Sequence, residues 1–260
     1  MVLIAVLLGL VTGSFANVLI SRVPANEQWW KGSSRCLSCK ADIAWYDNIP
    51  LISWLVLRGR CRHCGAAIGI RYPLVEAACA ALFVLVVWRF DVSAISVMLA
   101  VIAVVSVALT VIDLQHRRLP NVLTYSSYVI VIVGLTAHAV ITHEGWLLAR
   151  AGIGMVVLGG FYQVMRVVSR GGMGRGDVVT AGFLGLVLAA IGWKAFAVGA
   201  IAGPLIGGLA GIGAMIAARQ ARGVRIPYGP WLIGGAWIGI LSGDVFADWY
   251  LDVVTLSLSS

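Results

Sequence analysis

The sequence predicts an all-α polytopic membrane protein of about eight transmembrane helices, with a small cytoplasmic zinc-ribbon-like loop domain. Three observations lead to this prediction. Of the 260 residues 60% are hydrophobic and 12% are charged, and the mean hydropathy of +0.96 is far too high for a soluble domain. Apolar runs recur along the chain at about the twenty-residue length that a bilayer core requires of a helix. One polar segment, residues 21–73, interrupts these runs and contains two Cys-x-x-Cys motifs.

Five apolar runs are long enough to span a bilayer, and three more are marginal by length. The long runs are Met1–Ile20, Val92–Ile112, Val122–Ile141, Gly145–Val168 and Ala195–Ala218. The shorter runs are Leu74–Trp88, Val178–Ile191 and Tyr228–Leu241. Charge supports all eight, because Lys and Arg favour cytoplasmic loops and every span reverses the side. With eight spans, 16 of the 19 basic residues lie on one side, which we therefore predict to be cytoplasmic, and both termini lie outside.

This topology predicts a multi-pass membrane protein. It also accounts for the net charge of +8, so membrane lipid is expected as a partner and nucleic acid is not. The first apolar run has no basic segment before it and contains Gly13, Ser14 and Asn17, which favours a transmembrane helix over a cleaved signal peptide. Small and amide residues in such a helix also suggest close packing and an interhelical hydrogen bond.

We expect three parts: residues 1–20 as the first transmembrane helix, 21–73 as a cytoplasmic zinc-binding loop domain, and 74–260 as the remaining transmembrane domain. Four cysteines in the loop have the spacing of a tetrahedral zinc site, and they are Cys36, Cys39, Cys61 and Cys64. A pair of disulfides is the alternative, but disulfides are rare in the reducing cytosol. Four thiolates would close the coordination sphere, so the zinc is expected to be structural.

Two aspartates lie at the edges of apolar runs on the predicted cytoplasmic side. Asp177 ends the glycine-rich stretch 172–177 and is expected to begin a helix, where an aspartate often serves only as an N-cap. Asp113 follows the third span, and its alternative role is an ion pair with Arg117 or Arg118. Acids in a membrane segment are usually functional, so for the two aspartates together we favour a functional pair.

Other polar residues carry weaker signals. Glu76 is expected in the first turn of the second span, where it either complements the helix dipole or acts as a functional acid. The glycines of the seventh span predict a close-packing surface, and they are Gly203, Gly207, Gly208, Gly211 and Gly213. Three C-terminal acids, Asp244, Asp248 and Asp252, are expected in a solvated tail.

Taken in order, the motifs of the chain resemble those of the type IV prepilin peptidases, membrane aspartic proteases that also N-methylate their product. The resemblance rests on the Gly-Ser-Phe-x-Asn segment with Arg22-Val23-Pro24, both cysteine motifs, Asn48–Trp54 with Arg58–Cys61, Arg71–Glu76, Asp113 with Leu119-Pro120-Asn121, Gly174-x-Gly176-Asp177 and Pro227-Tyr228-Gly229-Pro230. The last motif offers no chemistry by itself. Many members carry a lysine two residues after the second aspartate, where this chain has Val179.

The resemblance implies that Asp113 and Asp177 are a catalytic dyad that shares a proton, and that residues 74–260 are the peptidase domain. It implies prepilin or pseudopilin substrates, hence a role in type IV pili or type II secretion, and S-adenosyl-L-methionine as methyl donor. Methyl transfer is expected in the polar loop together with Glu76. The alternatives are a peptidase without methyltransferase activity and a non-enzymatic channel or transporter, which would place acids near mid-membrane. The sequence does not indicate an oligomeric state.

Overall fold

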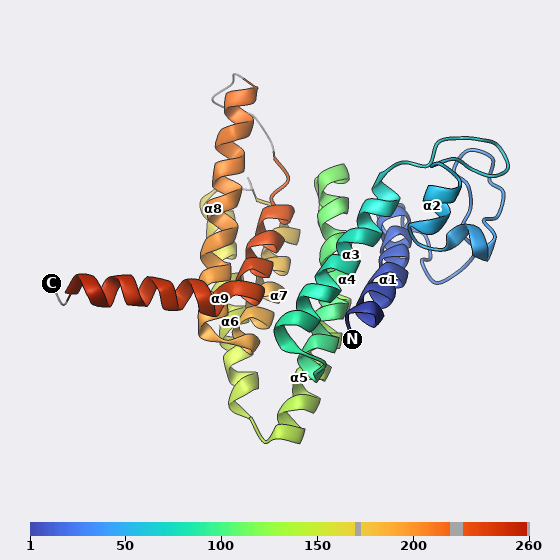
Figure 1. The fold of residues 1–260 in the computed structure, drawn as a ribbon. Helices are drawn as coiled ribbons and strands as arrows, with labels where there is room; N and C mark the ends of the chain where they lie inside the picture. Colours follow the sequence, from blue (N-terminus) through green and yellow to red (C-terminus); the bar gives the residue numbers. More distant parts are fainter. Residues whose placement is uncertain (170–172, 219–225, 259–260) are drawn as a thin grey trace. The chain divides into compact units, whose positions relative to one another are not determined.

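The protein is helical throughout the part that the structure describes. The computed structural model describes residues 1–169, 173–218 and 226–258, with side chains up to residue 255 (Figure 1). Within these ranges there is no strand, and only two isolated β-bridges occur, both in the polar loop. The predicted all-α fold is confirmed. The helices are α1 (Val2–Arg22), the 3-10 helix η1 (Trp45–Asn48), α2 (Ile52–Val56), α3 (Arg71–Phe90), α4 (Ala94–His116), α5 (Asn121–Thr142), α6 (Trp146–Val168), α7 (Arg175–Ile191), α8 (Trp193–Ala217) and α9 (Gly229–Leu258).

Seven of the described helices are long and apolar enough to cross a membrane: α1, α3, α4, α5, α6, α8 and α9. The eighth predicted span is α7, which has 17 residues, the lower end of the range for a transmembrane helix. A multi-pass membrane protein is therefore confirmed, and the count of eight depends on α7. Four of the arginines that support the predicted topology lie outside the described residues: Arg170, Arg219, Arg222 and Arg225. Gly172 of the glycine-rich stretch also lies outside them.

The chain forms two compact units, Met1–Ile112 and Asp113–Ser260. The last turn of α4 belongs to the second unit, so Asp113 and Asp177 lie in the same unit. The first unit contains the cysteine loop, α1 and α3.

In the first unit, α1 packs directly on α3 through glycines. A methyl group at Gly9 would lie 2.5 Å from the Cα of Ala80, and one at Gly13 would lie 2.7 Å from the Cα of Glu76. The Asn17 amide donates a hydrogen bond of 3.1 Å to the carbonyl of Tyr72 in α3. The predicted interhelical hydrogen bond and close packing are thus confirmed.

In the second unit, α7 is the central helix and contacts α5, α6, α8 and α9. All its residues from Thr180 to Ala190 are buried. Its closest approach is to α6, where a methyl group at Gly185 would lie 2.3 Å from the carbonyl oxygen of Gly154. A helix surrounded by others is apolar on every side, which explains why this short run has no polar face.

Helices α8 and α9 also pack through small residues. A methyl group at Gly235 would lie 2.2 Å from the backbone nitrogen of Gly203, and one at Gly207 would lie 3.1 Å from the Tyr228 ring. The predicted packing surface is confirmed at Gly203 and Gly207. It is wrong at Gly208 and Gly213, because no described atom lies within 4 Å of a methyl group placed there.

The C-terminal acids lie in a helix and not in a tail. Helix α9 continues past Leu241, where the apolar run was expected to end, to Leu258. Asp244, Asp248 and Asp252 are exposed, as predicted, but they are held on this helix. The expectation of a tail was wrong because three acids spaced four residues apart were judged by their charge alone, although that spacing suits a helix surface.

Candidate active site and metal centre

Asp113 lies in the last turn of α4, and its side chain is positioned by the start of α9. The residue is 4% exposed. The backbone N–H of Gly229 donates a hydrogen bond of 2.9 Å to its Oδ2. The first N–H groups of a helix have no partner within the helix, so they are natural donors to a carboxylate. The motif Pro227–Pro230, which the sequence left without chemistry, therefore supplies a donor to Asp113.

Asp177 occupies the third position of α7 and not its N-cap. The helix begins at Arg175, and Gly174 precedes it as N-cap. The Gly174 N–H donates a hydrogen bond of 3.0 Å to Asp177 Oδ2. The expectation that Asp177 begins the helix was wrong by two residues, because the side chain reaches back from the third position to the N-cap amide, as in a capping box.

The structure brings the two aspartates together around Leu119. Asp113 is close enough to act electrostatically on Asp177. A methyl group at Gly229 would lie 3.0 Å from Leu119 Cδ2, and one at Gly176 would lie 2.7 Å from the Leu119 carbonyl oxygen. Both glycines thus allow the start of α7 and the start of α9 to close around the segment after α4.

Two tyrosines accompany the aspartates. The hydroxyl groups of Tyr162 in α6 and Tyr228 before α9 lie 2.9 Å apart and share a hydrogen bond. The charge of Asp177 acts on both. Tyr162 is 1% exposed. This pair was not predicted from the sequence. The position of Tyr228 in a family motif was the one available signal, and Tyr162 had none.

Helix α5 fixes the first turns of α7. The hydroxyl groups of Thr124 and Thr180 are both fully buried and lie 3.4 Å apart. The Tyr128 hydroxyl donates to the carbonyl of Val179 at 3.1 Å. Val179 is therefore held through its backbone.

Glu76 is a buried acid of the first unit. Helix α3 begins at Arg71, so Glu76 lies in its second turn, and the expectation that it lies in the first turn was wrong. The residue is 8% exposed, and its Oε2 accepts a hydrogen bond of 2.8 Å from the N–H of Leu51 in the polar loop. Ser14 of α1 is a second hydrogen-bonding neighbour. Because dipole complementation requires the first turn, the structure favours a positioned acid.

The four loop cysteines converge on one point. Their sulfur atoms all lie within 4.8 Å of one another, and all four thiols are free. Cys36 Sγ and Cys64 Sγ are 3.8 Å apart. A tetrahedral site with metal–sulfur bonds of about 2.3 Å has sulfur–sulfur edges of about 3.8 Å. The cluster can therefore hold a metal ion, and the alternative of two disulfides does not describe it.

The two cysteine motifs have the same backbone structure. In the first, the N–H of Lys40 donates to the carbonyl of Cys36; in the second, the N–H of Gly65 donates to that of Cys61. Lys40 and Gly65 both have a left-handed φ, +60° and +71°. Backbone N–H groups of Cys39 and Ser38 lower the pKa of the Cys36 thiol to about 6. These amides stabilise a thiolate, the form that binds metal.

An ion pair joins the second motif to η1. Arg62 donates two hydrogen bonds, 2.8 and 2.6 Å, to the carboxylate of Asp47. This guanidinium lowers the pKa of Asp47. A bidentate pair fixes orientation as well as distance, so η1 and the second motif keep a defined position relative to each other.

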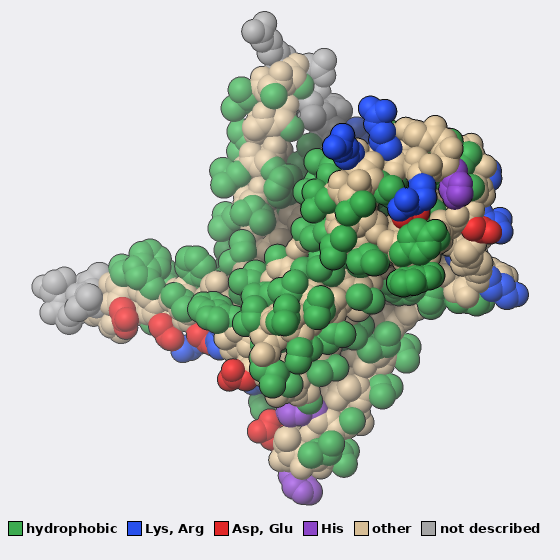
Figure 2. Space-filling model, turned by 45° about the vertical axis from the view of Figure 1, so that its right-hand side comes forward, with side chains coloured by type: hydrophobic (Ala, Val, Ile, Leu, Met, Phe, Trp, Pro, Cys, Tyr) green, Lys and Arg blue, Asp and Glu red, His purple; other side chains and the backbone are tan. Residues whose placement is uncertain are grey.

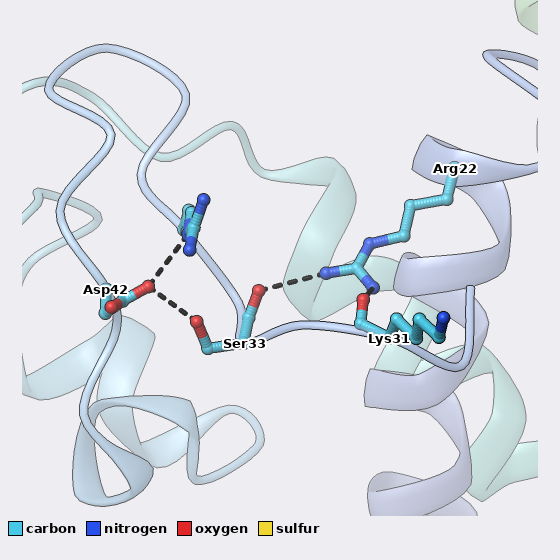
Figure 3. Close-up of polar contacts among 5 residues, drawn as sticks. Arg22, Lys31, Ser33 and Asp42 are labelled. Carbon is cyan, nitrogen blue, oxygen red and sulfur yellow. Dashed lines mark hydrogen bonds and ion pairs between the residues drawn. The ribbon is translucent and has the colours of Figure 1, made fainter. Parts of the chain in front are cut away.

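Arg22, the last residue of α1, anchors the start of the loop (Figure 3). Its guanidinium donates to the carbonyl oxygens of Lys31 and Ser33, the latter at 2.9 Å. The Ser33 hydroxyl donates in turn to the carboxylate of Asp42, at 2.5 Å. The arginine of the Arg22-Val23-Pro24 motif thus ties the transmembrane helix to the strand-like segment that carries the first cysteines.

Comparisons with known proteins cover both sites. The bacterial peptidase A24 N-terminal domain matches residues 7–90, and the type IV leader peptidase family matches residues 100–212. A protein of Stutzerimonas stutzeri named prepilin leader peptidase/N-methyltransferase is 32% identical over 98% of this chain and 95% of its own length. The chain belongs to the type IV leader peptidase family. Two further relatives have the same name. The protein of Aeromonas hydrophila is 34% identical over 94% of this chain and 92% of its own length. The protein of Pseudomonas aeruginosa is 33% identical over 96% of this chain and 93% of its own length.

The two family matches divide the candidate residues. The match to the A24 N-terminal domain contains the cysteine cluster and Glu76, and the match to the leader peptidase family contains Asp113 and Asp177. No solved structure matches the chain.

Proposed function

We propose that this protein cleaves the leader from type IV prepilins or secretion pseudopilins and then methylates the new N-terminal amine with S-adenosyl-L-methionine. The observation that carries the proposal is the convergence of Asp113 and Asp177, each with a carboxylate oxygen bound by a helix-start amide. Membership of the leader peptidase family and the names of its relatives support both activities.

For cleavage, Asp113 and Asp177 act as a pair that holds one proton. The ionised carboxylate takes a proton from a water molecule, whose oxygen attacks the scissile carbonyl carbon. The protonated carboxyl gives its proton to the carbonyl oxygen. When the tetrahedral intermediate breaks down, a proton passes to the departing amine. The amides of Gly174 and Gly229 hold the two carboxylates in place throughout, which is the structural requirement for such a pair.

For methylation, Glu76 is the proposed base. An amine must be neutral to attack the methyl group of S-adenosyl-L-methionine, and its nitrogen loses a further proton after the transfer. A buried carboxylate fixed by the Leu51 amide can accept such a proton. Asn17, on the same helix as Ser14, has a buried side-chain oxygen that accepts no hydrogen bond from any residue that the structure describes, and such an oxygen is an acceptor suited to an amine.

The loop cluster is proposed to hold one structural zinc ion through Cys36, Cys39, Cys61 and Cys64. The sulfur spacing and the thiolate-stabilising amides fit zinc, which prefers four thiolates in tetrahedral geometry. The ion would order the loop and, through Leu51, the Glu76 carboxylate.

The proposed orientation places the loop and both aspartates in the cytoplasm of a bacterial cell, at the inner membrane, with the termini outside. The excess of Lys and Arg on the loop side supports it. A prepilin with a cytosolic basic leader and a membrane-embedded helix would then present its junction to the dyad. The proposed division is a first helix (1–20), a zinc-binding loop domain that takes part in methylation (21–73) and a peptidase domain (74–260).

A channel or transporter is not favoured, because the chain belongs to a peptidase family and both aspartates lie at helix ends. The competing proposal is a peptidase without methyltransferase activity. One experiment decides between these functions: purified protein is incubated with a prepilin, with and without S-adenosyl-L-methionine, and the product masses are read.

We expect a cleaved product that gains one methyl increment only with the methyl donor. Asp113→Asn and Asp177→Asn should each reduce cleavage to background, and the double variant should be no worse, because residues that act as a unit are not additive. Near-wild-type turnover in either single variant would remove that aspartate from the dyad. A cleaved product that is never methylated would show that the protein is a peptidase without methyltransferase activity.

A further inference from the structure

Helix α9 has a C-terminal part, residues 244–258, that begins where its close packing through glycines ends. Gly243 is the last glycine of α9, and a methyl group there would lie 2.6 Å from the Cα of Ala195 in α8. The C-terminal part of α9 turns away from α8 and projects sideways (Figure 1). A Ser-Gly pair, Ser242-Gly243, stands at the start of this part, a sequence at which helices often bend.

This projecting part is amphipathic. Asp244, Asp248 and Asp252 recur every four residues, so at about 100° per residue they occupy an arc of about 80°. Thr255 falls within the same arc. Large apolar side chains fill the rest, and Figure 2 shows the acidic side chains along one edge of this helix and hydrophobic ones along the other.

The apolar side is exposed in the protein alone. Phe246, Trp249, Tyr250 and Val253 are 51%, 65%, 61% and 47% exposed. Their positions lie opposite the aspartates on the helix. Solvated helices do not usually present four such side chains on one face, so this face is expected to have a partner.

An ion pair with α8 fixes the position of residues 244–258 along the axis of the bundle. Lys194, the second residue of α8, forms an ion pair with Asp248. Gly229, which binds Asp113, lies at the other end of the α9 span, about 21 Å away along the axis for 14 residues at 1.5 Å each. Residues 244–258 thus leave the bundle at the end opposite the dyad.

We propose that residues 244–258 form an interfacial helix that lies in the zwitterionic headgroup region of the leaflet opposite the dyad, with its apolar arc in lipid and its aspartates in water. Lipid is the occupant because the side chains of the apolar arc are about as exposed as Ile201, Leu205 and Leu209 of α8, a helix that is long and apolar enough to cross a membrane and on which α9 packs. Trp249 and Tyr250 are the residue types that concentrate at membrane interfaces. A polar face opposite an apolar face is the arrangement of helices that lie in the membrane interface.

The charge of the polar arc selects among membranes. Basic interfacial helices are drawn to anionic lipids, whereas a row of aspartates is repelled by them. Apolar burial therefore supplies the binding.

The test uses full-length protein reconstituted in phosphatidylcholine vesicles, with a nitroxide attached to single introduced cysteines. Trp249→Cys and Val253→Cys report the apolar arc, and Asp252→Cys and Thr255→Cys are matched controls on the polar arc of the same helix. Wild-type protein taken through the same labelling gives the background from native cysteines. Accessibility to oxygen, which concentrates in lipid, and to a water-soluble nickel complex is measured for each label.

We expect the ratio of oxygen to nickel accessibility to be severalfold higher at 249 and 253 than at 252 and 255. Adding phosphatidylglycerol to the vesicles should lower the ratio at 249 and 253. Equal, nickel-dominated accessibility at all four positions would place the helix in water and overturn the proposal. Loss of accessibility to both reagents at 249 and 253 would show that protein, such as a second copy of the chain, covers the face, and would overturn it equally.

Discussion

At the scale of single residues, the amide of Gly229 shows how a backbone group can hold a carboxylate. Its nitrogen lies 2.9 Å from Asp113 Oδ2, and a methyl group on its Cα would lie 2.8 Å from the same oxygen. A side chain at this position would therefore displace the carboxylate from its donor. Leu119, which a methyl group at Gly229 would approach to 3.0 Å, leaves no room on the other side.

Gly229→Ala is therefore expected to lower the rate of prepilin cleavage while the protein remains folded. Loss of a hydrogen bond to a charged group costs about 2 kcal/mol, or roughly thirtyfold in rate. Gly234→Ala on the same helix is the control, because a methyl group there meets its nearest atom at 3.6 Å, an ordinary contact. Cleavage is measured by product mass; equal rates for the two variants would show that the Gly229 amide does not position Asp113.

Glu76→Gln is expected to lower methylation of the cleaved product by roughly a hundredfold, the lower end of what a positioned base contributes, and to leave cleavage largely unchanged. Glutamine keeps an acceptor for the Leu51 amide, so the loop contact is retained. The assay follows cleaved and methylated products by mass in the same reaction. Undiminished methylation would contradict the proposal that Glu76 is the base. Loss of both activities would show that Glu76 has a structural role.

Residue types with a chemistry of their own could be predicted from the sequence, and their partners could not. Asp113, Asp177 and the four cysteines are recognisable because acids are rare in apolar segments and because ligand spacing is regular. The amide of Gly229 and the Tyr162–Tyr228 pair were missed, because each contact joins segments far apart in the chain. Every residue except proline has a backbone N–H, so the sequence does not indicate which side chain such a donor binds.

At the scale of elements, α1 and α3 approach each other because glycines on α1 leave space for the α3 backbone. Gly13 lies against Glu76, so the packing of two helices also places the proposed base. Between membrane helices such close contact is a main source of association, since lipid is as apolar as the side chains.

Gly13→Ala is expected to push α1 from α3 and to reduce methylation more than cleavage, because Glu76 moves with the contact. Gly134→Ala in α5 is the control, since nothing lies within 4 Å of a methyl group there. Thermal unfolding in detergent and both product masses are compared. A Gly13→Ala protein with the stability and methylation of the control would show that the contact is dispensable.

Helix existence was predictable from apolar runs, but helix ends were not. Helix α3 begins at Arg71, before the apolar run, because Pro73 is compatible with a first turn. Helix α9 continues through three aspartates, because they share one face and leave the other apolar. Both differences changed a functional interpretation. Glu76 lies in the second turn and not in the first, and the predicted tail is an amphipathic helix.

At the scale of the whole molecule, the two candidate sites belong to different compact units, Met1–Ile112 and Asp113–Ser260. We expect one zinc ion per chain by metal analysis. Cys39→Ser should lose the ion and lower methylation, and should lower cleavage much less, because the aspartates are held by helices of the second unit. Cys79→Ala, which changes a buried cysteine outside the cluster, should keep the ion. Zinc-free wild-type protein, or equal metal content in the two variants, would contradict the metal site.

The shortness of α7 has a consequence for water inside the helix bundle. Its 17 residues measure about 25 Å, against about 30 Å of hydrocarbon. Trp193, two residues beyond the end of α7, is 45% exposed, which suits an anchor at the membrane surface farther from Asp177. The missing length then falls at the other end, where Asp177 lies. Because α5, α6, α8 and α9 all contact α7, this shortfall lies within the bundle and not against lipid. We expect it to admit the water that hydrolysis consumes.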